Sequence, residues 1–106
     1  MTFRIQIVPI DGFRLFGALV SKEIDLYRKK QGTFFRSGPK TANRAKWSHK
    51  SYPGWVNLEK SVGEVVCVEI RSRQKSSAEW QLVRAFVGFL ARHFTKRIRT
   101  INIHFH

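Results

Sequence analysis

Acidic residues are scarce in this sequence. Seven Asp and Glu stand against twenty Lys and Arg, which gives a formal net charge of +13 and an isoelectric point of about 11.0. A charge excess of this size says little about the fold, but it indicates partners that carry negative charge. We therefore expect a partner that is nucleic acid (RNA or single-stranded DNA) or an acidic protein.

Cysteine and long apolar runs are also nearly absent. Cys67 is the single cysteine, so the chain forms no internal disulfide and no multi-thiolate metal site. Its β-branched neighbours predict a buried thiol that acts as a small apolar side chain. No stretch approaches the ~18 apolar residues of a membrane span, and the first residues lack the apolar core of a signal peptide. We expect a cytoplasmic protein with no membrane span.

The length and the apolar content indicate one folded domain over residues 1–106. A chain of 106 residues buries roughly 65% of its unfolded surface. Its apolar fraction of 42% is too high for a disordered basic tail.

The N-terminal third predicts a β-hairpin followed by an ambiguous segment. Phe3, Ile5 and Ile7 alternate with polar residues, which is the period of a half-buried strand. Asp-Gly at 11–12 separates this run from a second apolar run, so we predict that 3–9 pairs with 13–20. Residues 21–32 fit a helix capped by Ser21 and also an alternating strand, and we favour the helix.

The middle of the chain predicts loops with short strands. Glycine and proline punctuate residues 32–54, with strands expected near 33–36 and 45–49. Residues 55–59 read as a strand. The nearly continuous apolar run within 64–71 is typical of a central strand covered on both faces.

Residues 76–97 predict one long helix. Ser76 and Glu79 fit a capping box, and apolar residues follow at helical spacing. Residues 98–106 alternate as a final strand. The expected fold is therefore α+β: a mostly antiparallel sheet of four to six strands, with one long C-terminal helix packed across it and the final strand after the helix. The expected core is Phe3, Ile5, Leu15, Val66, Val68, Leu82, Phe86, Leu90, Ile101 and Ile103.

The positive charge concentrates in a basic, loop-rich segment over residues 28–54. No acidic residue occurs between Asp25 and Glu59, and aromatic residues are interleaved with the cations. Cations spaced through such a segment can contact successive phosphates while aromatic rings stack unpaired bases. We predict a small binding domain that contacts nucleic acid or another polyanion, without catalysis. The predicted binding residues are Arg28, Lys29, Lys30, Arg36, Lys40, Arg44, Lys46, Trp47, Lys50 and Tyr52.

Two other function classes fit the composition. One is a protein-interaction module, an inhibitor or an assembly subunit, that docks on an acidic partner. The other is a small metal-independent RNase with His49 and Glu59 as general acid and base, since histidine titrates near neutrality. His104 and His106 form an H-x-H pair without an evident third ligand, so we expect no metal and no cofactor.

Overall fold

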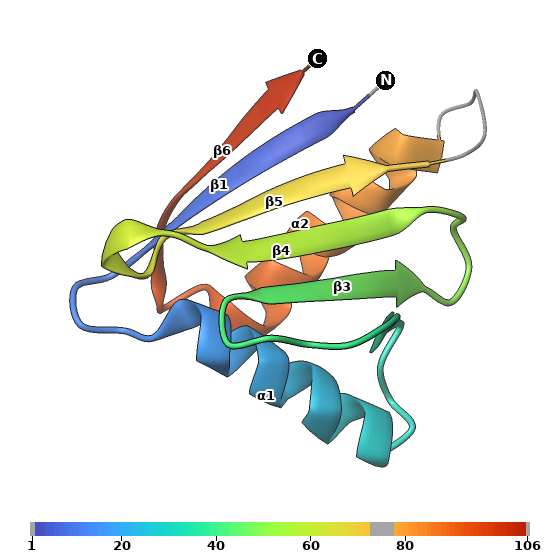
Figure 1. The fold of residues 1–106 in the computed structure, drawn as a ribbon, viewed down its shortest axis with the longest axis horizontal. Helices are drawn as coiled ribbons and strands as arrows, with labels where there is room; N and C mark the ends of the chain where they lie inside the picture. Colours follow the sequence, from blue (N-terminus) through green and yellow to red (C-terminus); the bar gives the residue numbers. More distant parts are fainter. Residues whose placement is uncertain (1, 73–77, 106) are drawn as a thin grey trace.

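The computed structural model describes residues 2–72 and 78–105. Six strands form one antiparallel sheet in the order β2-β3-β4-β5-β1-β6, and two helices accompany it (Figure 1). In chain order the elements are β1 (Phe3–Pro9), α1 (Leu15–Arg28), β2 (Phe34–Arg36), β3 (Arg44–His49), β4 (Trp55–Lys60), the 3₁₀ turn η1 (Val62–Glu64), β5 (Val66–Arg71), α2 (Ala78–Phe94) and β6 (Ile98–Phe105).

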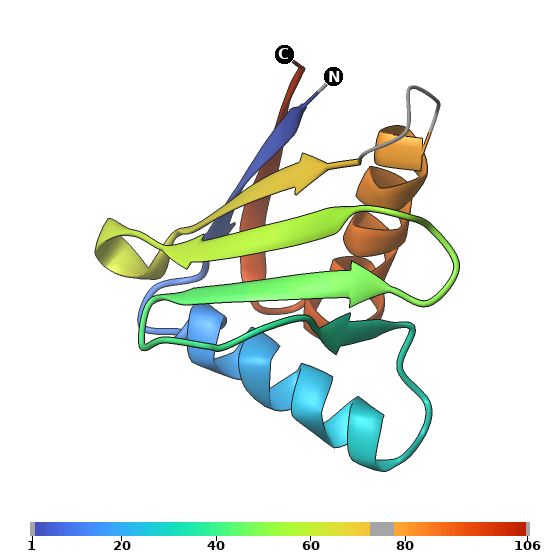
Figure 2. The same ribbon diagram turned by 45° about the vertical axis from the view of Figure 1, so that its right-hand side comes forward.

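Both helices cover the same face of the sheet (Figure 2). Alternate strand residues such as Ile5, Val68 and Val56 point to that face and join one buried cluster with both helices. The other strand residues, such as Arg4 and Glu69, point to a second face that no described helix covers. We call this second face the open face. The sheet therefore has one apolar side and one polar side.

The connections explain the strand order. β1-α1-β4 and β5-α2-β6 are two interlocked β-α-β units, because β5 lies between β1 and β4, and β1 lies between β5 and β6. The hairpin β2–β3 is inserted between α1 and β4 and extends the sheet at one edge. The expected antiparallel sheet and the strand after the long helix are confirmed.

The predicted hairpin of 3–9 with 13–20 is wrong. Residues 15–28 form α1, so the sheet carries two helices rather than one. A continuous apolar run fits a strand and a buried helix equally well, and here both neighbours of β1 are other strands, β5 and β6. Helix was the right choice for 21–28, but Ser21 lies inside α1 rather than at its N-cap.

The later elements follow the sequence more closely. The short strands expected near 33–36 and 45–49 are β2 and β3, and the strand expected at 55–59 is β4. β5 is central, but only one of its faces is covered, so Cys67 is exposed and the prediction of a buried thiol is wrong. α2 ends at Phe94 rather than residue 97. The capping serines Ser76 and Ser77 lie outside the described residues.

The core confirms most of the predicted residues. Eight of the ten are buried, whereas Ile101 and Ile103 are half-buried because β6 is an edge strand. Trp47, a predicted binding residue, is only 1% exposed. Its ring centroid lies 5.5 Å from that of Phe89, 6.1 Å from Phe86 and 6.0 Å from Phe34, so it joins β3 to β2 and α2.

Among the glycines, Gly54 has the closest neighbours. Its φ is +126°, and a Cβ there would overlap the backbone carbonyl oxygen of Arg71 and lie 2.8 Å from Cδ1 of Leu82. Glycine is therefore required for steric reasons as well as for backbone conformation.

We predict that Gly54→Ala lowers the free energy of unfolding by at least about 3 kcal/mol, measured by urea denaturation. Gly38→Ala is the matched control, because Gly38 also has a positive φ of +117° but nothing within 4 Å of its would-be Cβ. The control isolates backbone strain, roughly 1–2 kcal/mol. Equal losses in the two variants would show that the close packing at Gly54 costs nothing.

Candidate functional site

Every acidic side chain of the chain is either in an ion pair or buried. Five carboxylates pair with cations: Glu69 lies 2.7 Å from Arg71, and the other pairs are Asp11–Arg99, Asp25–Lys29, Glu59–Arg44 and Glu64–Lys60. Glu23 and Glu79 are each 5% exposed. The carboxylates therefore neutralise particular cations, and the excess positive charge is carried by the cations without such a partner.

The remaining cations have no carboxylate within 4.0 Å among the described residues. They fall on three parts of the molecule: α1, the β2–β3 edge with its loops, and α2 with the turn that follows it. They are Arg14, Lys22, Arg28, Lys30, Arg36, Lys40, Lys46, Lys50, Arg84, Arg92, Lys96 and Arg97.

The predicted binding residues separate into two groups. Lys29 and Arg44 are already in ion pairs with Asp25 and Glu59, 3.1 Å and 3.6 Å away. The six cations without such partners extend from the C-terminal end of α1 across β2 and β3 to the loop before β4. They are Arg28, Lys30, Arg36, Lys40, Lys46 and Lys50.

The segment 28–54 is more regular than its sequence indicates. Besides β2 and β3, backbone hydrogen bonds run from Ser37 N–H to the Lys46 carbonyl (2.7 Å) and from Lys50 N–H to the Thr33 carbonyl (2.8 Å). These bonds hold the loops on either side of β2 against the neighbouring chain. The cations are thus presented from a fixed edge of the sheet rather than from a long irregular loop.

Most aromatic residues interleaved with these cations are not free to stack a ligand. Trp47 is buried, Tyr52 is half-buried with its ring 4.7 Å from that of His49, and Trp55 lies beneath the Lys46 ammonium, 4.6 Å from its ring centroid. Trp47 and Tyr52 therefore do not serve the predicted stacking role. The exposed rings are Phe35 within the segment and Tyr27 just before it, at 40% and 67% exposure.

The fold brings these two exposed rings to one place. Tyr27 from α1 and Phe35 from β2 line a hollow of about 520 Å³, together with Arg28 and Arg36. We call this hollow, with Lys30 and Lys50 from the turns that follow α1 and β3, the α1–β2 surface. Sequence spacing alone does not pair Tyr27 with Phe35, because the seven residues between them include the end of a helix and a turn.

Glu23 is the acid that lines the same hollow. Its carboxylate accepts a hydrogen bond from the backbone N–H of Arg36, so it ties α1 to the outer edge of β2. Burial raises the pKa of Glu23, while the charge and the N–H of Arg36 oppose that rise. The hollow therefore contains two guanidinium groups and one carboxyl group with a weakened tendency to ionise.

The predicted acid–base pair is not assembled. His49 points to the core face of β3, where its ring lies 4.8 Å from that of Phe34. Glu59 is on the open face at the other end of the β3–β4 ladder, paired with Arg44. A separation of five residues along a strand is about 17 Å, so the two groups cannot serve one phosphate. His49 and Glu59 are therefore too far apart to form the acid–base pair that the RNase hypothesis named.

His49 instead organises the loop that follows β3. Its Nδ1 accepts hydrogen bonds from the backbone N–H groups of Ser51 (2.9 Å) and Tyr52 (3.2 Å). Burial lowers the pKa of His49 below its usual 6.5, because the charged ring would lose hydration. Protonation of Nδ1 would also break both hydrogen bonds.

The open face holds a larger hollow, about 850 Å³ in volume. The side chains of the open face form two polar rows that cross the sheet: His104, Arg4, Glu69, Asn57 and Lys46 in one, and Asn102, Gln6, Cys67, Glu59 and Arg44 in the other. Sequence alternation in these strands could have revealed the rows. Arg4, Arg44 and Arg71 are ion-paired there, with Glu69 shared by Arg4 and Arg71, while Lys46 has no carboxylate partner among the described residues.

Comparison with known proteins assigns nothing further. No family model, curated protein or solved structure matches the chain. Within residues 2–72 and 78–105, no helix is long and apolar enough to cross a membrane. Over the same residues, no group of three His, Cys, Asp or Glu side chains is placed to hold a metal ion; His106 lies outside them.

We predict that His49→Ala costs roughly 1–3 kcal/mol of stability, because it leaves two backbone N–H groups without their acceptor. His49→Asn is the matched control, since an Asn side-chain oxygen can accept the same two bonds. Because the folded-state pKa of His49 is lowered, its contribution is present above about pH 6.5 and is lost as the pH falls through the folded-state pKa.

The wild type should therefore lose stability relative to His49→Asn as the pH falls from 7 to 5. Thermal unfolding of both proteins across this range measures the difference, and the contribution of His93, whose pKa is also lowered, cancels in it. Parallel stability curves for the two proteins would contradict the assigned role of Nδ1.

Proposed function

We propose that this protein binds single-stranded nucleic acid through the α1–β2 surface and catalyses no reaction on it. The observation that carries the proposal is the pair of exposed rings, Tyr27 and Phe35, in one hollow with Arg28 and Arg36. Unpaired bases stack on aromatic side chains regardless of their sequence, and adjacent cations contact the phosphates that connect them. The protein is then a binding domain with weak sequence preference.

The distribution of charge supports the same surface. Lys30 and Lys50, in the adjoining turns, have no ion-pair partners in the described part of the chain, whereas on the open face Arg4, Arg44 and Arg71 are engaged by Glu59 and Glu69. The remaining open-face cation, Lys46, lies over the ring of Trp55. A cation already paired in the free protein must exchange one partner for another, so it contributes less to binding. Phosphates are therefore best accommodated at the α1–β2 surface.

Single strands suit the geometry better than a duplex. The stacking groups lie in a hollow at a sheet edge, and a base must leave its stack to reach them. A duplex groove is usually read by a projecting basic helix. At this position the helix is α1, and its face carries the aromatic residue Tyr27. We therefore expect RNA or single-stranded DNA to bind more tightly than double-stranded DNA of the same length.

The affinity for a labelled thymidine oligonucleotide of about twelve residues should fall steeply with salt. Two to six phosphate contacts give a slope of log K against log salt between about −1.4 and −4.2 for a single strand. Fluorescence anisotropy from 50 to 300 mM salt, roughly the range over which such effects are resolved, measures it. An affinity that does not change with salt concentration would contradict the proposal.

The double variant Tyr27→Ala/Phe35→Ala should weaken binding by about 1–3 kcal/mol for each base that stacks. Both side chains are exposed, so thermal stability should change little. The salt slope should stay the same, because no cation is removed. Unchanged affinity would mean that the rings do not contact the ligand.

Arg28→Ser/Arg36→Ser should weaken binding more than Arg84→Ser/Arg92→Ser, which removes the same charge from α2. If the two pairs have equal effects, the nucleic acid responds to the net charge alone and the α1–β2 surface is not the site. Anisotropy titrations at one fixed salt concentration make the comparison.

A further inference from the structure

The two edges of the sheet differ in how they are protected. β2 has only three residues, and Glu23 from α1 accepts the backbone N–H of Arg36 on its outer side. β6 has eight residues and pairs with β1 alone among the described strands. An unprotected edge of this length presents a row of backbone N–H and C=O groups to any extended chain.

An apolar strip lies beside this edge on its helix side. Ile101 and Ile103 are half-buried, and Phe105 and Trp80 are 65% and 41% exposed. The Trp80 ring lies 6.1 Å from Phe105, so the start of α2 and the end of β6 share one exposed aromatic cluster. The opposite side of β6 carries the polar residues Thr100, Asn102 and His104. An added strand would thus meet one apolar and one polar side.

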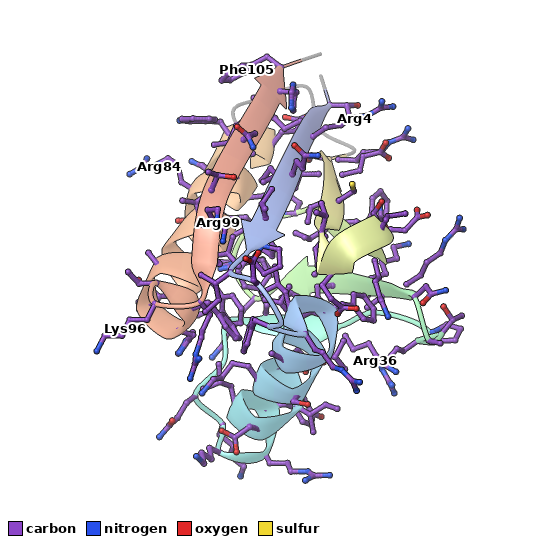
Figure 3. The ribbon with its side chains drawn as sticks, turned by 90° about the vertical axis from the view of Figure 1, so that its left-hand side faces the viewer. Arg4, Arg36, Arg84, Lys96, Arg99 and Phe105 are labelled. Atoms are coloured by element: carbon purple, nitrogen blue, oxygen red, sulfur yellow. The ribbon has the colours of Figure 1, made fainter. Side chains whose placement is uncertain are left out.

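The surroundings of β6 are positive. Figure 3 looks onto this edge and shows Arg84 and Lys96 along its helix side, with Arg4 on the other side. Arg84 and Lys96 have no ion-pair partner within the described residues, and Asp11, near the start of β6, already pairs with Arg99 at 3.2 Å. Carboxylates on a segment that binds here would be attracted to these cations.

We propose that the outer edge of β6 binds an extended acidic segment of another protein as a seventh strand of the sheet. Backbone hydrogen bonds to β6 supply the docking, as in other cases of strand addition. Apolar side chains of the segment cover Ile101, Ile103 and the Trp80–Phe105 cluster, and its carboxylates approach Arg84 and Lys96. This site is separate from the α1–β2 surface, which lies at the other edge of the sheet.

A second copy of this chain is the less favourable occupant. Pairing two β6 strands would bring Arg84 and Lys96 of one copy toward the same cations of the other, within two chains that each carry +13. Like charges across a strand pair are destabilising. Charge complementarity therefore selects an acidic segment over self-association.

The probe is a capped peptide of alternating Glu and Val, about eight residues long to match the length of β6. Calorimetry measures its affinity, and amide hydrogen exchange locates it. We expect binding, with slower exchange of the β6 amides. The matched control peptide is N-methylated at every peptide nitrogen, so it keeps the charge and side chains but donates no backbone hydrogen bond. It should bind at least roughly tenfold more weakly.

Variants of the protein test the charge argument. Arg84→Glu/Lys96→Glu should weaken binding of the Glu-Val peptide roughly tenfold. The matched control, Lys40→Glu/Lys50→Glu, makes the same charge change on the β2 side and should alter the affinity by less than about twofold. Tyr27→Ala/Phe35→Ala should leave peptide binding unchanged, which separates this site from the nucleic-acid proposal.

Four results would overturn the proposal. Equal binding of the N-methylated peptide, or equal effects of the two charge-reversal pairs, would reduce the interaction to net charge. Sedimentation showing a dimer with protected β6 amides would assign the edge to a second copy. Protection of β6 by the thymidine oligonucleotide would assign it to nucleic acid.

Discussion

The burial of Trp47 is the contact on which the proposed nucleic-acid surface depends. β3 is held in the sheet by β4 on one side, and the indole packs against Phe86 and Phe89 of α2 on the core side. Phe34 of β2 joins the same cluster, and aromatic pairs of this kind add about 0.5–1.5 kcal/mol beyond the area they bury. Since Phe34 must face inward, its neighbour Phe35 must face outward. The exposure of the Phe35 ring thus follows from the burial of Phe34 against Trp47.

Much of the fold could be predicted from local patterns, because period and turn chemistry act over a few residues. The alternation in β1 and β6, the short strands β2 to β4 and the long helix α2 were all evident from the sequence. The failure at residues 13–20 has a physical cause. Leu15 to Val20 is apolar enough to be buried in either conformation, and the choice of helix depends on β5 and β6 already occupying both sides of β1. That information is not local.

The candidate site could be predicted in part. The acid-free window between Asp25 and Glu59 located the basic edge, but composition could not tell which cations are paired or which rings are buried. Trp47 and Phe35 look alike in a list of aromatic residues, and only their opposite positions on neighbouring strands separate a core residue from an exposed one. The pairing of Arg44 with Glu59 likewise depends on strand register, which no spacing rule supplied.

The exposed position of Cys67 limits how two copies of this protein can be joined covalently. The thiol lies in the middle of β5, beside Gln6 and Glu59 in a row that crosses the open face. As the chain has no other cysteine, oxidation can link two molecules only through this face. A disulfide-linked pair would therefore join the two molecules through their open faces. The β6 edges and the α1–β2 surfaces lie at the edges of each sheet, away from the open face. The linked pair would therefore carry two copies of each surface.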